Sequence, residues 1–193
     1  MASFIAQRYS KQGLVSLFLT CSFPIHLWAL LLAFRDISWL TERTNLWDAI
    51  GVTSYGLLFA FVESVMIFLA LVLLGFIVPW QWPPERRITF LGLLFLLVSI
   101  WGITSQLLFL WNISLPPQAI LFLRSVSHPL RILYAASLAV VIPTILLPVY
   151  FFVRSKSSVA FMQDLMERFS LLTLFYLFFD AVGLLIVIIR NIS

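Results

Sequence analysis

Three titratable side chains, those of His26, Glu63 and Asp180, each lie near the middle of a long apolar stretch of the sequence. With a rise of about 1.5 Å per helical residue, we expect all three within about 3–5 Å of the centre of a membrane. A charged side chain at that depth costs about 2.5–3.5 kcal/mol even on the most lenient insertion scale. We therefore take the three residues as the candidate intramembrane polar site.

No Lys or Arg lies inside the apolar stretches to neutralise the two acids. Each carboxyl group is expected to be protonated, because burial disfavours its charged form, or to be paired with His26 or a bound cation. We expect Glu63 to face the interior of the helix bundle, because Gly56 and Ala60 share its helix face. If Glu63 and Asp180 lie within about 4–6 Å of each other, they should share one proton.

Other polar side chains occur in the predicted spans and are expected to support this site. They are Ser99 and Gln106 in the third span, Thr144 in the fourth and Tyr176 in the fifth. Small and polar residues let transmembrane helices approach closely and hydrogen-bond, at about 0.6 kcal/mol per bond. Packing explains these residues well, but it explains the two acids less well, because a serine or glutamine would serve without the cost of a carboxylate.

The sequence contains no motif for catalysis or for binding a cofactor. It has no nucleophile elbow, P-loop or dinucleotide fingerprint, and no HExxH or Cys-His spacing that would bind zinc. His26 and His128 are not expected to ligate one haem, because His128 falls in a predicted loop. We therefore predict no catalytic residue, no metal site and no cofactor.

The composition is that of a polytopic membrane protein. Of 193 residues, 62% are hydrophobic and 10% are charged, whereas soluble proteins have about 25% charged residues. The net charge of +4 would indicate nucleic acid in a soluble chain, but here the basic residues lie between the apolar stretches. In that position they orient the spans and contact lipid headgroups. We expect the lipid bilayer, and not nucleic acid, as a partner.

The expected fold class is all-α, a single transmembrane bundle over residues 1–193. Five spans are predicted, at about residues 14–34, 49–78, 88–110, 131–152 and 169–189. The loops after the third and fourth spans should each form a short amphipathic helix in the membrane interface. The second and third spans are expected to pair as an antiparallel hairpin, and Pro143 and Pro148 are expected to kink or split the fourth.

The distribution of basic residues predicts the orientation. With five spans, seven Lys and Arg residues fall on the side of the N-terminus and five on the opposite side. An excess of basic residues marks the cytoplasmic side. We therefore expect a multi-pass protein of the plasma membrane with a cytoplasmic N-terminus and an external C-terminus.

Three kinds of function are compatible with these features. The first, which we favour because the chain is small and lacks motifs, is a non-catalytic subunit, scaffold or accessory factor that associates with other membrane chains or with itself. The second is a proton- or cation-coupled transporter or conduit that uses Glu63 and Asp180. The third is an integral membrane enzyme acting on a lipid-soluble substrate, with His26 and the two acids as acid and base.

Overall fold

The computed structural model describes residues 8–192, and this part of the chain contains six α helices and no strand. The helices are α2 (Lys11–Arg43), α3 (Leu46–Leu74), α4 (Pro84–Leu110), α5 (Pro117–Ser125), α6 (Pro129–Arg154) and α7 (Lys156–Ile192). All except α5 are long and apolar enough to cross a membrane. The predicted all-α fold with five spans is confirmed, and the chain is a multi-pass integral membrane protein.

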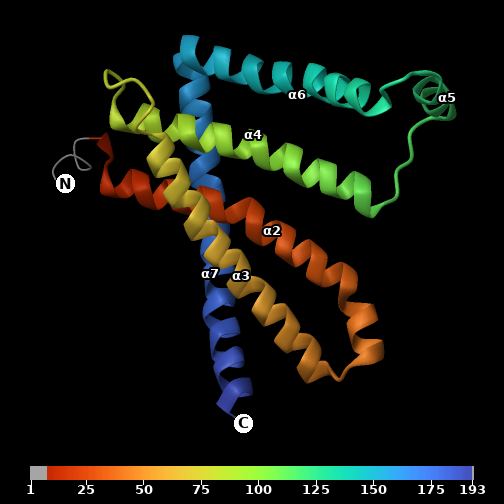
Figure 1. Cartoon of the computed structure of the whole chain (residues 1–193). Helices are drawn as coiled ribbons and strands as arrows, with labels where there is room; N and C mark the ends of the chain where they lie inside the picture. The colour runs from red at the N-terminus through yellow and green to blue at the C-terminus, as the bar shows by residue number, and fades with distance from the viewer. Residues whose placement is uncertain (1–7, 193) are drawn as a thin grey trace.

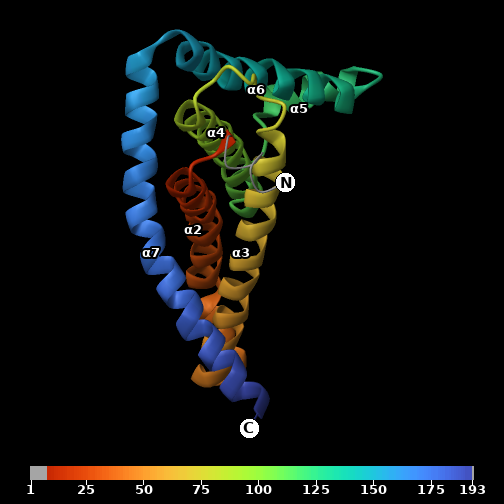
Figure 2. The same cartoon turned by 90° about the vertical axis from the view of Figure 1, so that its left-hand side faces the viewer.

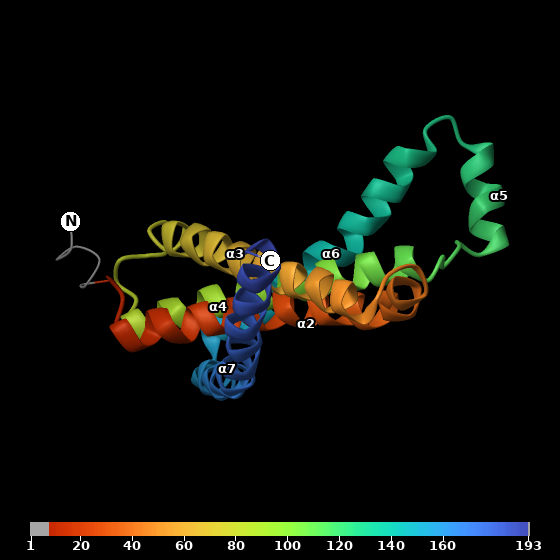
Figure 3. The same ribbon diagram turned by 90° about the horizontal axis from the view of Figure 1, so that it is seen from below.

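Helices α2 and α3 form the centre of the molecule. They run antiparallel, make the most extensive contact of any helix pair, and both pack against α7. Helices α4 and α6 cross α7 at a steep angle, and α5 lies at the far end of both (Figure 1). Figure 2 shows α7 on one side of α2 and α3. Seen from below, α5 and α6 project away from the remaining helices (Figure 3).

The sharp turn between α2 and α3 follows from its capping residues. Helix α2 ends at Arg43, and the N–H of Thr44 still bonds to the carbonyl of Leu40 at 2.9 Å. Asn45 then caps α3, its side-chain oxygen accepting the N–H of Asp48 at 2.9 Å. Asp48 places a negative charge in the first turn of α3, where the helix dipole favours it. Two residues therefore suffice to reverse the chain.

The expected hairpin between the second and third spans is not formed. Helix α3 packs on α2 and α7, whereas α4 packs mainly on α2, with smaller contacts to α6 and α7. The nine residues 75–83 that connect α3 to α4 allow this, because they carry the chain away from α3 before α4 begins.

Several predicted breaks are continuous helix in the structure. Pro143 and Pro148 both lie within the single helix α6. The amphipathic segment after residue 154 is not a separate helix, because it forms the first turns of α7, and its Met162 and Met166 are buried in the same core cluster as residues of α4. The short helix predicted after the third span is present as α5.

A buried arginine fixes the path of the loop between α3 and α4. The guanidinium of Arg87, which is 1% exposed, donates hydrogen bonds to the main-chain oxygens of Arg8 (2.9 Å), Pro79 (3.1 Å) and Trp82 (3.2 Å). The carbonyls of Pro79 and Trp82 lie in the irregular loop between α3 and α4, outside the regular hydrogen bonding of a helix. Arg87 therefore joins the N-terminal segment, the loop and the start of α4.

The segment before α2 completes this network at the end of α3. Arg8 donates to the carbonyl of Phe76 at 2.9 Å, and the Tyr9 hydroxyl donates to the carbonyl of Val72 at 2.8 Å. The last carbonyls of a helix lack partners within the helix, and these two bonds satisfy one near the end of α3 and one just beyond it. Burial raises the pKa of Tyr9, which outweighs the opposing effect of the two nearby arginines. The hydroxyl therefore keeps its proton and remains a donor.

We predict that Arg87→Lys destabilises the protein. Lysine cannot donate to several carbonyls from one planar group, and each carbonyl left buried without a donor costs about 1–3 kcal/mol. A loss of about 2 kcal/mol corresponds to a fall of about 4–8 °C in melting temperature for a chain of this size. Tryptophan fluorescence of the purified protein in detergent measures it. Arg131→Lys, at an exposed position of α6, is the matched control, and equal melting of the two variants would contradict the role assigned to Arg87.

Candidate functional site

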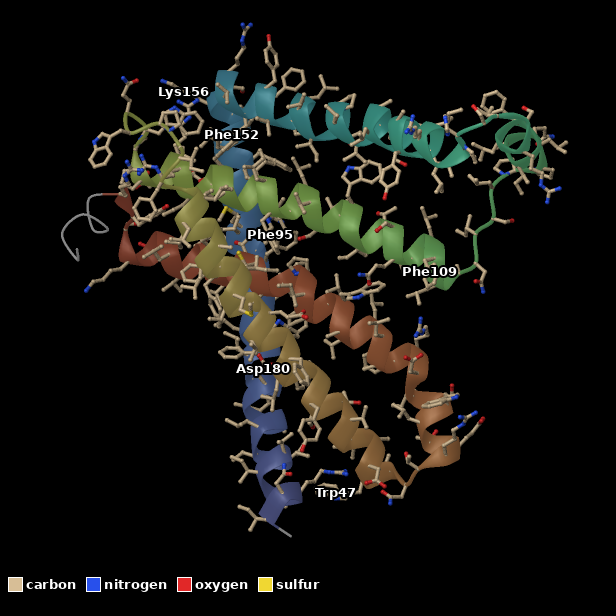
Figure 4. The ribbon with its side chains drawn as sticks, viewed as in Figure 1. Trp47, Phe95, Phe109, Phe152, Lys156 and Asp180 are labelled. Carbon is tan, nitrogen blue, oxygen red and sulfur yellow. The ribbon has the colours of Figure 1, made fainter. Side chains whose placement is uncertain are left out.

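The structure brings together two of the three predicted site residues. Nε2 of His26 on α2 lies 2.9 Å from Oδ2 of Asp180 on α7, and the two side chains are 0% and 8% exposed. Figure 4 shows Asp180 on the stretch of α7 that α2 and α3 cross. The contact therefore joins α2 to α7 deep inside the bundle.

The second ring nitrogen of His26 shows how many hydrogens this pair holds. Nδ1 lies 2.8 Å from the carbonyl oxygen of Ser22, one turn earlier in α2. A carbonyl oxygen can only accept, so Nδ1 carries a hydrogen and donates it. The Nε2···Oδ2 contact then requires one hydrogen, either on Nε2 beside an ionised Asp180 or on Oδ2 beside a neutral imidazole. In both forms the pair has no net charge, which suits an apolar surrounding.

The other carboxyl oxygen of Asp180 favours one of these two forms. Oδ1 is buried and accepts no hydrogen bond from the described residues. An unpaired carboxylate oxygen costs more in an apolar interior than an unpaired carbonyl oxygen of a neutral acid, because it carries charge. The neutral form, in which Asp180 donates its hydrogen to Nε2 of His26, therefore fits the structure better.

Neighbouring side chains from α7 enclose this pair. The ring of Tyr176, predicted as a supporting residue, stacks on His26 with centroids 5.9 Å apart and planes 6° from parallel. The Thr173 hydroxyl lies 2.9 Å from the carbonyl of Leu19 on α2. The carbonyl that the missing N–H of Pro24 leaves without a helical donor is the next one, that of Thr20. Thr173 thus adds a second polar contact between α2 and α7.

A further contact between α7 and α3 is made by Arg190, in the last turn of α7. Its Nη2 lies 2.8 Å from Oδ1 of Asp48, and its Nη1 donates to the carbonyl of Trp47 at 2.6 Å. A Cβ at Gly51 would overlap the guanidinium, so a larger residue there would require the Arg190 side chain to move. Trp47 lies at the end of the molecule where α7 terminates (Figure 4).

Glu63 lies apart from the His26–Asp180 pair. It is exposed on α3, and within residues 8–192 it forms no hydrogen bond or ion pair. The buried face of α3 includes Leu57, Ala60 and Ser64, and Glu63 is rotated about 100° from Ser64 around the helix axis. Glu63 therefore does not take the interior position expected for it, and the hydrogen-bonded partner of Asp180 is His26.

Glu63 lines an open groove of about 450 Å³, which we call the Glu63 groove. Trp28 of α2, Gly56 of α3 and Gln106 of α4 also line it. An adjoining hollow of about 400 Å³ shares Trp28, Leu32 and Gln106, so the hollow surface continues along α2 toward the end of α4. A Cβ at Gly56 would meet nothing within 4 Å. This glycine is therefore not needed for packing among the chain's own helices.

The remaining predicted residues lie elsewhere. Thr144 of α6 accepts a hydrogen bond from Nε1 of Trp101 of α4 at 3.0 Å, which links these two helices. Ser99 is half-buried on α4 and takes part in neither the His26–Asp180 pair nor the Glu63 groove. In the part of the chain that the structure describes, no three His, Cys, Asp or Glu side chains form a group that could hold a metal ion.

Comparison with known protein families, with curated proteins and with solved structures gives no match to this chain. The fold and the site therefore define the class of protein, a multi-pass helical membrane bundle. Its two polar features differ in kind, because His26 and Asp180 satisfy each other inside the bundle while Glu63 lies exposed in a groove.

We predict that Asp180→Asn leaves the stability within about 1 kcal/mol of the wild-type value. The amide N–H can donate to Nε2 of His26 as the neutral carboxyl does, whereas Asp180→Leu leaves Nε2 unpaired and should cost about 1–3 kcal/mol. Thermal unfolding in detergent compares the three proteins. A loss of about 3–5 kcal/mol in the asparagine variant, as expected when one partner of a buried ion pair is removed, would contradict the neutral form.

Proposed function

We propose that the protein is a non-catalytic subunit of a membrane assembly and that the Glu63 groove receives a transmembrane helix of another chain. The observation that carries this proposal is the position of Glu63, which is exposed near the middle of α3 and unpaired within residues 8–192. Facing lipid, an ionised carboxyl group at this depth would cost about 2.5–3.5 kcal/mol. A helix from a partner protein removes that cost by supplying a polar group.

The partner helix is expected to carry a Lys or Arg near the middle of the membrane. An opposite charge stabilises a carboxylate at this depth more than a neutral donor does. A second copy of this chain does not supply one, because its apolar stretches contain no Lys or Arg and His26 is buried against Asp180. Gly56, which is exposed and at which a Cβ would meet nothing within 4 Å, lets another helix approach α3 closely. Gln106 of α4, which also lines the groove, offers a further hydrogen-bonding group.

The position of α6 is compatible with a subunit of this kind. Phe152 is the one buried residue of α6, and this helix contacts α4 and, to a smaller extent, α7. Lipid surrounds an apolar helix as favourably as protein does, so the exposed apolar surface of α6 does not by itself require a partner. Because α6 does not line the groove, a helix from another chain has access to Glu63.

A second candidate function is proton- or cation-coupled transport. It is favoured by the single hydrogen held between His26 and Asp180, together with the unpaired Oδ1 of Asp180. A transport site must exchange its proton or cation with water on both sides of the membrane. His26 and Asp180 are almost completely buried and line neither the Glu63 groove nor the hollow that adjoins it. We therefore place transport second to the role of a subunit.

We also propose that the protein lies in the plasma membrane with a cytoplasmic N-terminus and an external C-terminus. The seven-to-five distribution of basic residues supports this orientation. It is further supported by the hydrogen bonds of Arg86 and Arg87, which bring three basic segments to one end of the molecule. These segments are residues 8–11, the first turn of α4, and the junction of α6 and α7.

We predict that Glu63→Gln detaches the partner chain. Wild-type protein purified in mild detergent from cells that normally make it should carry one partner at fixed stoichiometry, measured by native mass spectrometry. Removing the ion pair should cost about 1.4 kcal/mol or more of binding free energy, which raises the Kd of the partner at least tenfold. Glu42→Gln removes an equally exposed acid beyond the apolar stretch of α2 and should retain the partner.

Two results of this experiment would contradict the proposed function. One is that the wild-type protein carries no partner in any mild detergent and has the same mass composition as the glutamine variant. The other is a stoichiometric partner that stays bound to the Glu63→Gln variant as tightly as to the wild-type protein.

A further inference from the structure

A basic pocket of about 410 Å³ lies where α6 meets α7, and it does not depend on the Glu63 groove. It is lined by three basic side chains, those of Arg86, Arg154 and Lys156, together with Ser155 and one acid, Glu85. In Figure 4, Lys156 lies at this junction, beside the loop that connects α3 to α4. The lining therefore carries an excess of positive charge.

The three cations are not neutralised by the described part of the chain. None of them takes part in the ion pairs formed within residues 8–192. Arg86 donates one hydrogen bond, from Nη2 to the carbonyl of Val153 at 2.6 Å, and its Nε is buried without an acceptor. A buried guanidinium nitrogen without a partner is unfavourable. An anionic ligand with several acceptor oxygens would remove that deficit.

The start of α7 adds to the attraction for an anion. Helix α7 begins at Lys156, directly after Ser155, and is 37 residues long. The first N–H groups of a helix have no partner within the helix, and the helix dipole makes this end positive. The hydroxyl of Ser155, which precedes α7, accepts a hydrogen bond from one of these groups, the N–H of Ser158, at 3.4 Å. Phosphate groups bind at such positions when basic side chains surround them.

Two of the guanidinium groups lie against aromatic rings. Arg86 lies over the ring of Trp82 at 4.5 Å, and Arg154 lies over the ring of Tyr150 at 4.7 Å. Tryptophan and tyrosine favour the membrane interface. Phe151, beside the pocket in sequence, is an exposed apolar residue that can contact an acyl chain. These features distinguish a lipid phosphate from a free phosphate ion.

We propose that this pocket binds the headgroup phosphate of an anionic phospholipid. The three basic side chains and the N-terminus of α7 contact the phosphate, and the acyl chains lie along exposed apolar residues of α6. This pocket faces the side that carries most of the basic residues, which is the side where anionic lipids are concentrated if the N-terminus is cytoplasmic.

The test uses the full-length protein in nanodiscs of phosphatidylcholine with phosphatidylglycerol as the anionic probe, and native mass spectrometry of the lipids it retains. Each basic residue removed at a membrane surface weakens binding about fivefold. Arg154→Gln combined with Lys156→Gln should therefore lower retention of phosphatidylglycerol about thirtyfold, and Lys156→Gln alone about fivefold. Glu85→Gln should strengthen retention, because it removes the one acid of the pocket. Arg124→Gln combined with Arg131→Gln, both outside the pocket, should change nothing.

Three outcomes would overturn the proposal. Retention of phosphatidylglycerol that is equal in the wild-type protein and in both pocket variants would show that the pocket does not bind it. A weakening by Glu85→Gln would show that its charges do not act on the ligand. Displacement of the lipid by millimolar inorganic phosphate would show a site for free anions and not for a phospholipid. If the double variant unfolds, the single Lys156 variant and Glu85→Gln still give opposite predicted changes.

Discussion

The hydrogen bond between His26 and Asp180 joins α2 to α7 in a region where lipid could replace neither partner. Because the two side chains share one hydrogen bond and have no net charge as a pair, an acid can be kept in the membrane-spanning part of α7 at little cost. Thr173 adds a second contact to α2, and Arg190 joins the end of α7 to the start of α3. Helix α7 thus crosses two antiparallel helices and is held by polar contacts at its centre and its end.

The opposite end of the bundle depends on buried arginine in the same way. Arg87 and the segment before α2 supply donors to main-chain carbonyls at the end of α3 and in the loop that follows. This loop leads α4 onto α2, and α4 and α6 then diverge from α3. The Glu63 groove lies beside that divergence, since α2 and α3 line most of it and Gln106 is the residue that α4 contributes. The path of the loop between α3 and α4 therefore helps to determine whether Glu63 is accessible.

Much of this architecture can be predicted from the sequence, and the parts that cannot share a physical reason. Hydropathy predicts the five spans, and it correctly assigns His26, Glu63 and Asp180 to three different long apolar helices. It does not predict how a helix is rotated about its axis. Glu63 is exposed although its neighbour Ser64 is buried, because adjacent residues of a helix face different directions. From the sequence, Arg87 can be interpreted only as a positive charge that helps to orient the spans. Its hydrogen-bond acceptors include loop carbonyls such as that of Pro79, and hydrophobic periodicity does not predict the path of a loop.

The central claim, that a helix of another protein occupies the Glu63 groove, is tested most directly by photocrosslinking in intact cells. A benzophenone amino acid at Phe59, which lines the groove and is 68% exposed, is compared with the same amino acid at Phe178 of α7, which is 64% exposed. We predict that Phe59 gives one protein adduct, with the crosslinked peptide in a transmembrane segment that contains Lys or Arg, and that Phe178 gives lipid adducts. Lipid adducts at both positions would contradict the claim.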